Sequence, residues 1–86
     1  MPAPLNVSVS QLDIAAAAFG WEKKSTQLLR ANEVRTVWTR GDEKVTVDRE
    51  GTQIVHFAWV KDANNFAMVG DDHAGVEALV QLSQIA

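Results

Sequence analysis

The chain has no cysteine among its 86 residues. Disulfide bridges, thiolate catalysis and cysteine-based zinc sites are therefore excluded. A small domain without disulfides fits a reducing compartment. Because so short a chain buries only roughly 60–65% of its unfolded surface, its stability has to come from a compact apolar core.

Long apolar runs are also missing. The longest, residues 14–19, is far shorter than the roughly 20 residues that a membrane-spanning helix needs. Residues 1–5 contain neither the basic region nor the long apolar stretch of a signal peptide. We therefore expect a cytoplasmic protein that does not bind membranes.

The sequence has no excess of basic residues. Eight Lys and Arg stand against eleven Asp and Glu, which gives a net charge of −3. Proteins that bind the phosphate backbone usually have a concentrated basic stripe. The cations that would contact a nucleic acid are scattered among acids: Lys23, Lys24, Arg30, Arg35 and Arg40. Nucleic-acid binding is therefore an alternative and not the first hypothesis.

Catalytic motifs are absent as well: there is no Gly-rich phosphate loop, no His-Glu zinc motif and no serine elbow. His73 follows Asp71 and Asp72, but consecutive residues at a helix start point in different directions, so we interpret the acids as helix caps. His56 is predicted about two residues away from Asp48 along the strand pairing, too far for acid–base chemistry. We predict a non-enzymatic protein with no cofactor and no metal site.

What the sequence does contain is typical of a globular protein, with 47% hydrophobic and 22% charged residues. Its length allows one domain. Residues 1–7, which include both prolines, are predicted to form an N-terminal arm, and residues 8–86 a single domain.

The first helix is predicted by its end signals. Ser8 or Ser10 suits the N-cap, with a polar residue three positions later in capping-box register. Apolar residues then recur at helical spacing up to Phe19, and Gly20 suits the left-handed position after the helix. A second helix is predicted near the C-terminus, beginning at Asp71 or Asp72.

Between the helices, alternating β-branched and aromatic residues predict strands over 34–40, 43–48 and 52–60. Residues 66–69 are either a fourth strand, which we favour, or an apolar linker. Residues 22–32 are interpreted as a loop or short irregular strand. The fold class is therefore α+β, in the order α-β-β-β-(β)-α, with an antiparallel meander and two helices packed on one face.

The turns predict which side chains face the helices. Gly41-Asp42 forms a two-residue turn that sets Trp38 opposite Val45, and a three-residue second turn sets Val45 opposite Val55. A two-residue second turn would instead exchange the faces of the third strand. The predicted core face consists of Val34, Trp38, Val45, Val47, Val55, Phe57 and Trp59.

The opposite face of the sheet is more apolar than solvation requires, although surfaces are often apolar in part. Its predicted contact residues are Val37, Thr39, Ile54, His56, Ala58 and Val60. We predict a protein–protein interaction module, with a homodimer through this face or an edge strand as a further expectation. The alternative is a nucleic-acid-binding domain with a double-stranded-RNA-binding-like fold.

Two family resemblances accompany this prediction. Phe19-Gly20-Trp21 and the run from Val37 to Val47, within residues 12–60, resemble small accessory proteins of actinobacterial phages, which implies a non-enzymatic protein acting on a host factor. The order of elements is similar to that of HicA-type mRNA-interferase toxins. Those toxins have a Gly-Ser-His segment where this chain has Asn32-Glu33-Val34, so the resemblance implies the fold without the ribonuclease centre.

Overall fold

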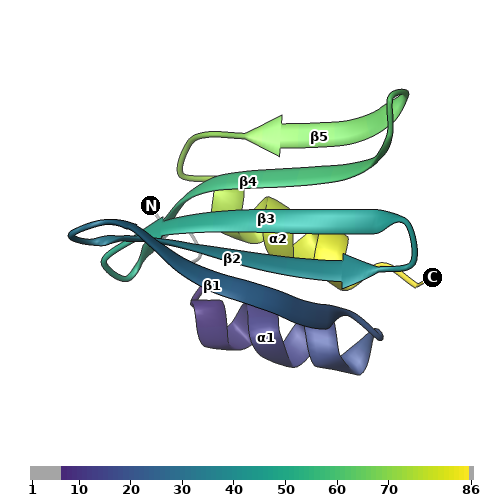
Figure 1. Cartoon of the computed structure of the whole chain (residues 1–86), viewed down its shortest axis with the longest axis horizontal. Coiled ribbons are helices and arrows are strands. Elements are labelled where there is room, and N and C mark those ends of the chain that lie inside the picture. Colours follow the sequence, from purple (N-terminus) through teal and green to yellow (C-terminus); the bar gives the residue numbers. More distant parts are fainter. Residues whose placement is uncertain (1–6, 86) are drawn as a thin grey trace, which may run out of the picture.

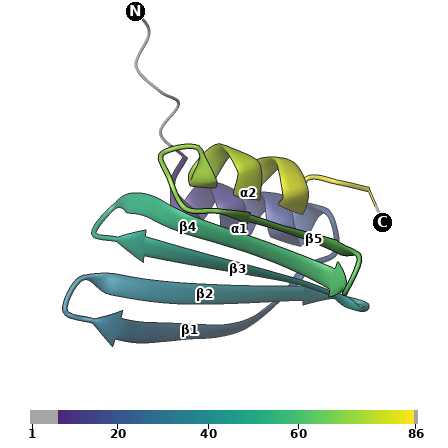
Figure 2. The ribbon, with the colours of Figure 1, turned by 90° about the horizontal axis from the view of Figure 1, so that it is seen from above.

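A computed structural model describes residues 7–85, which form two helices and a five-stranded antiparallel sheet (Figure 1). The elements are α1 (Val9–Ala18), β1 (Glu22–Arg30), β2 (Glu33–Arg40), β3 (Glu43–Glu50), β4 (Gln53–Asp62), β5 (Asn65–Val69) and α2 (Ala74–Leu82). Both helices lie on the same side of the sheet (Figure 2). The predicted α+β class, with two helices on one face of an antiparallel meander, is confirmed.

The ends of α1 follow the predicted signals. The Ser8 side chain accepts a hydrogen bond from the backbone N–H of Gln11, and the Gln11 side chain accepts one from the N–H of Ser8. At the other end Gly20 has a φ of 83°, and the N–H of Trp21 donates to the Ala16 carbonyl over 2.8 Å. Local chemistry therefore determines both ends of this helix.

The strands pair in sequence order from β1 to β5. Residues 22–30, interpreted from the sequence as a loop or short irregular strand, form the nine-residue edge strand β1. Their side chains are mostly exposed, so they lack the apolar alternation that identifies a strand. Residues 65–69 form β5, the strand favoured over a linker.

The first predicted turn is confirmed, and the second is wrong. Arg40 pairs with Glu43 around the turn, as predicted, and Trp38 lies opposite Val45. In the second hairpin, however, Glu50 pairs with Gln53, which leaves a turn of two residues, and Val45 lies opposite Trp59 instead of Val55.

The shorter turn alone would point Phe57 and Trp59 away from the helices, but a bulge in β4 turns them back toward the helices. Asp48 pairs with His56 but Arg49 pairs with Ile54, so Val55 is an extra residue on β4. Because side chains alternate along a strand, one extra residue reverses the faces. Phe57 therefore faces the helices as predicted, while Ile54, on the other side of the bulge, faces them too.

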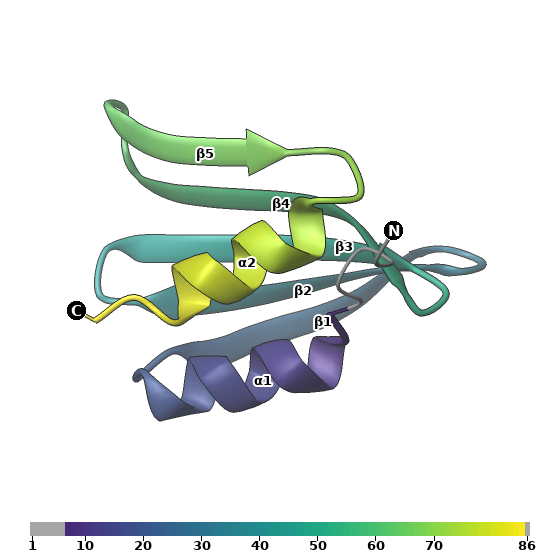
Figure 3. The ribbon, with the colours of Figure 1, turned by 180° about the vertical axis from the view of Figure 1, so that it is seen from behind.

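The core lies between the sheet and the two helices (Figure 3). Helix α2 packs on β4 and β3, and α1 lies beside α2 and contacts β1. Gly75 of α2 lets the helix approach the sheet closely, because a Cβ there would lie 3.5 Å from Cδ1 of Ile54 and 3.3 Å from Cβ of Val7. Val7 is buried, so the last residue of the predicted arm contributes to the core; residues 1–6 lie outside the described range.

Helix α2 begins later than predicted. His73 and not Asp71 or Asp72 occupies the N-cap position, and its side chain makes no capping hydrogen bond. Asp71 instead accepts a hydrogen bond of 2.8 Å from the backbone N–H of His73 and so stabilises the turn before the helix.

Candidate functional site: the open face of the sheet

The side of the sheet opposite the helices is not covered by any element of residues 7–85; Figure 1 looks onto it, with the helices behind. We call this the open face. Strand pairing brings its side chains into rows that run across the strands. Its members on β2 to β5 are Arg35, Val37, Thr39, Lys44, Thr46, Asp48, His56, Ala58, Val60, Phe66 and Met68.

Four of these residues form what we call the apolar patch: Ala58, Val60, Phe66 and Met68. Ala58 pairs with Met68 and Val60 pairs with Phe66, so the patch is continuous across β4 and β5. Val60 is 44% exposed, Phe66 61% and Met68 68%. A phenylalanine and a methionine this exposed, side by side, are unusual for a solvated surface and typical of a contact surface.

A polar row borders the apolar patch. Nε of Arg35 donates to Oδ1 of Asp48 over 2.8 Å and Nη2 donates to Oδ2 over 3.0 Å. This bidentate hydrogen bonding, together with the carboxylate charge, raises the pKa of Arg35 above its ordinary value. Asp48 is only 7% exposed, and the guanidinium is the group that pairs with its buried carboxylate.

His56 stands at the end of this row. The observed register places it directly opposite Asp48, so the predicted separation of about two residues is wrong. Nδ1 of His56 lies 3.9 Å from Oδ2 of Asp48, beyond hydrogen-bond distance, and has no other partner in the described part of the chain. The imidazole of His56 therefore lies beside Asp48 without a hydrogen bond between them.

The structure places five of the six predicted contact residues on the open face, but not Ile54. Ile54 is 5% exposed and lies beneath α2 beside Gly75, so its assignment to the outer face is wrong. The reason is the two-residue second turn, the alternative left open by the sequence, which pairs Ile54 with Arg49 and turns it inward; the bulge at Val55 then restores the predicted inward face of Phe57. Sequence reasoning missed Phe66 and Met68 as contact residues, because residues 66–69 are all apolar and no alternation shows which of them face outward.

The five cations of the nucleic-acid alternative do not converge on one surface. Lys23 pairs with Asp13 of α1 at 3.1 Å, and Lys24 pairs with Glu22 at the same distance. Arg35 is held by Asp48, as described above. Arg30 lines a shallow pocket of about 190 Å³ that also contains two glutamates.

The side chain of Arg40, the fifth cation, is largely buried and connects several elements. Nη2 lies 3.1 Å from the Glu43 carboxylate, and Nη1 donates to the backbone carbonyls of Phe19 and Gln84, at 3.0 and 2.7 Å. Its guanidinium lies 4.4 Å from the centre of the Trp21 ring. It therefore joins the C-terminal ends of both helices to the sheet and is not available to a phosphate.

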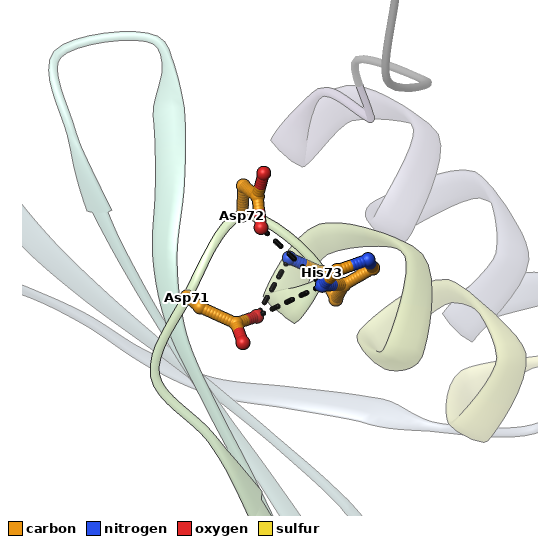
Figure 4. Close-up of side chains that lie close together, drawn as sticks. All are labelled: Asp71, Asp72 and His73. Atoms are coloured by element: carbon orange, nitrogen blue, oxygen red, sulfur yellow. Dashed lines mark hydrogen bonds and ion pairs between the residues drawn. The ribbon is translucent and has the colours of Figure 1, made fainter.

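The acidic segment before α2 groups three potential metal ligands. Asp71, Asp72 and His73 bring their ligand atoms within 4.8 Å of one another (Figure 4). Nδ1 of His73 lies 3.3 Å from an oxygen of each aspartate. All three are exposed and consecutive, and the Asp71 carboxylate already accepts the His73 N–H, so this geometry is explained by the turn itself.

No helix within residues 7–85 is both long and apolar enough to cross a membrane. Comparison of the chain with protein-family models, with curated proteins and with solved structures finds no match.

Proposed function

We propose that this chain is a non-enzymatic protein–protein interaction module that binds its partner through the open face of its sheet. The observation that supports this most directly is the exposure of Phe66, Met68 and Val60 in one continuous apolar patch. Aromatic residues and methionine are enriched at the centres of interfaces.

The surroundings of the patch also suit an interface. The Arg35–Asp48 pair borders the patch toward one end of β3, and Lys44, opposite Val60, borders it toward the other end. Protein interfaces typically combine an apolar centre with such a polar rim. A rim of this kind contributes orientation and specificity more than affinity. The partner surface is therefore expected to be apolar at its centre and to have hydrogen-bonding groups at its edge.

Nucleic-acid binding has weaker support. Four of its five proposed cations are engaged with carboxylates, and they belong to different surfaces. The relationship to phage accessory proteins acting on a host factor, and the absence of catalytic activity, stay predictions.

The proposal is tested by affinity capture from a lysate of the cells that produce the protein, with Val60→Glu as the interface variant. Val80→Glu is the matched control, because Val80 is 49% exposed against 44% for Val60 but lies on α2, on the other side of the molecule. A carboxylate at the centre of an apolar interface has to be desolvated on binding, even though Lys44 lies opposite position 60, and should weaken binding at least about tenfold.

The expected result is one partner captured by the wild type and by Val80→Glu but not by Val60→Glu, with all three chains showing the same cooperative thermal unfolding. Capture that Val80→Glu removes and Val60→Glu leaves intact would place the contact surface on the helices and contradict the proposal. Failure of the wild type to enrich any protein would contradict it as well.

A further inference from the structure

Strand β5 is an open edge of the sheet. It is the last strand in the sheet order, and within residues 7–85 no segment pairs with its outer side. Figures 1 and 3 show it at the margin of the sheet, clear of both helices. The edge strand itself, Asn-Phe-Ala-Met-Val, contains no charged residue and no proline. It therefore lacks the charged residues and prolines that often prevent an edge from accepting another strand.

The opposite edge, β1, has those features. Its pairing with β2 is interrupted by two irregularities, between Lys23 and Ser25 and between Leu28 and Arg30. Lys23, Lys24 and Arg30 place three cations along the strand. Bulges and lysines are standard protection against edge-to-edge pairing, so the two edges of this sheet are not equivalent.

We propose that β5 binds β5 of a second copy of this chain, in antiparallel orientation, so that two sheets join into one. Antiparallel pairing of identical strands follows from a twofold axis, the usual symmetry of homodimers. With the axis at Ala67, Phe66 lies opposite Met68 of the second copy, and Met68 lies opposite its Phe66. Cross-strand contacts between an aromatic ring and a methionine sulfur are favourable.

The absence of charge also favours a second copy as the occupant. Residues 63–70 contain no ionisable side chain, so two copies of this segment meet without like-charge repulsion. The methyl group of Ala67, at the axis, is small enough to face its own copy. A charged partner strand would gain no ion pair here and would have to desolvate its charges.

The contact is small, so the dimer is expected to be weak. Five residues of strand extend over about 17 Å. The interface should therefore bury less than the roughly 1,200 Å² at the lower end of stable interfaces. Each copy also has a net charge of −3, which opposes association at low salt. We expect reversible dimerisation in the micromolar range.

Sedimentation equilibrium over a range of protein concentrations tests this inference with two single variants. Phe66→Lys and Met68→Glu each place a charge opposite an apolar side chain and should weaken self-association at least about tenfold. In an equimolar mixture, the introduced lysine of one variant lies opposite the introduced glutamate of the other, so a heterodimer should form within about threefold of the wild-type affinity. Leu28→Lys is the matched control, since Leu28 is 69% exposed on the other edge strand.

The inference predicts a wild-type dimer, loss in each single variant, recovery in the mixture and no effect of Leu28→Lys. A wild type that stays monomeric at millimolar concentration would overturn it, and so would variants that fail to recover on mixing. Val60→Glu separates this inference from the proposed function, because Val60 lies on β4 inside the sheet: it should abolish partner capture and leave the dimer intact. A monomer that still captures a partner through Val60 would overturn the dimer alone.

Discussion

Replacing Ile54 with alanine should destabilise the domain by about 3 kcal/mol, because the substitution removes a buried aliphatic side chain whose cavity the neighbours fill only in part. Ile54 is 5% exposed and packs against α2 beside Gly75. A domain of this length has a total stability of about 4–13 kcal/mol, so the loss is a large fraction of it. The midpoint of thermal unfolding should fall by about 12–24 °C.

Urea unfolding followed by tryptophan fluorescence measures this effect, since Trp21 and Trp38 are both buried and report on the core. Val60→Ala is the control: Val60 is on the same strand but on the open face, and its truncation should cost no more than about 0.5 kcal/mol. If Val60→Ala proved the more destabilising of the two, the bulge at Val55 and the face assignment built on it would be refuted.

Two further predictions concern charged side chains. Arg40→Gln should lower the free energy of unfolding, measured with urea, by about 2–4 kcal/mol, because the largely buried Glu43 carboxylate loses its cation and two helix-end carbonyls lose their donor. Arg40→Lys should recover only part of this loss, and full recovery would show that the charge alone suffices. Hydrogen bonds from the Asn64 backbone N–H and the Asn65 side chain lower the pKa of Asp62. A lowered folded-state pKa contributes stability that is present above the unfolded pKa, about 3.9, and is lost as the pH falls through the folded value. Asp62→Asn should therefore reduce the stability difference between pH 6 and pH 2.5, and an unchanged difference would contradict the assignment.

Local signals in the sequence were sufficient for the features whose causes are themselves local. The capping box of Ser8 and Gln11, the left-handed Gly20 and the turn at Gly41 each depend on a few consecutive residues, and all three are found where they were predicted. The alternation of apolar residues in β2 and β3 also placed Trp38 and Val45 correctly in the core, because a two-residue turn leaves their pairing no freedom.

Two features of the fold were beyond the sequence because they depend on contacts between distant segments. The bulge at Val55 is one: it lets Ile54 fill the space beneath α2 while Phe57 stays in the core, and this gain exists only once the helix has docked. The edge strand β1 is the other, since its exposed, polar residues are held by pairing with β2 and not by any alternation of their own.

The sequence by itself therefore determined the fold class, the ends of α1 and the identity of most of the apolar side chains. Only the tertiary structure decided that Arg40 is engaged, because it donates to the carbonyls of Phe19 and Gln84, which lie 21 and 44 residues away in the sequence. It also decided that Phe66 and Met68 join Val60 in one exposed patch. The physical reason is the same in each case: alternation within a strand is written in the sequence, whereas the register between strands depends on what the whole sheet packs against.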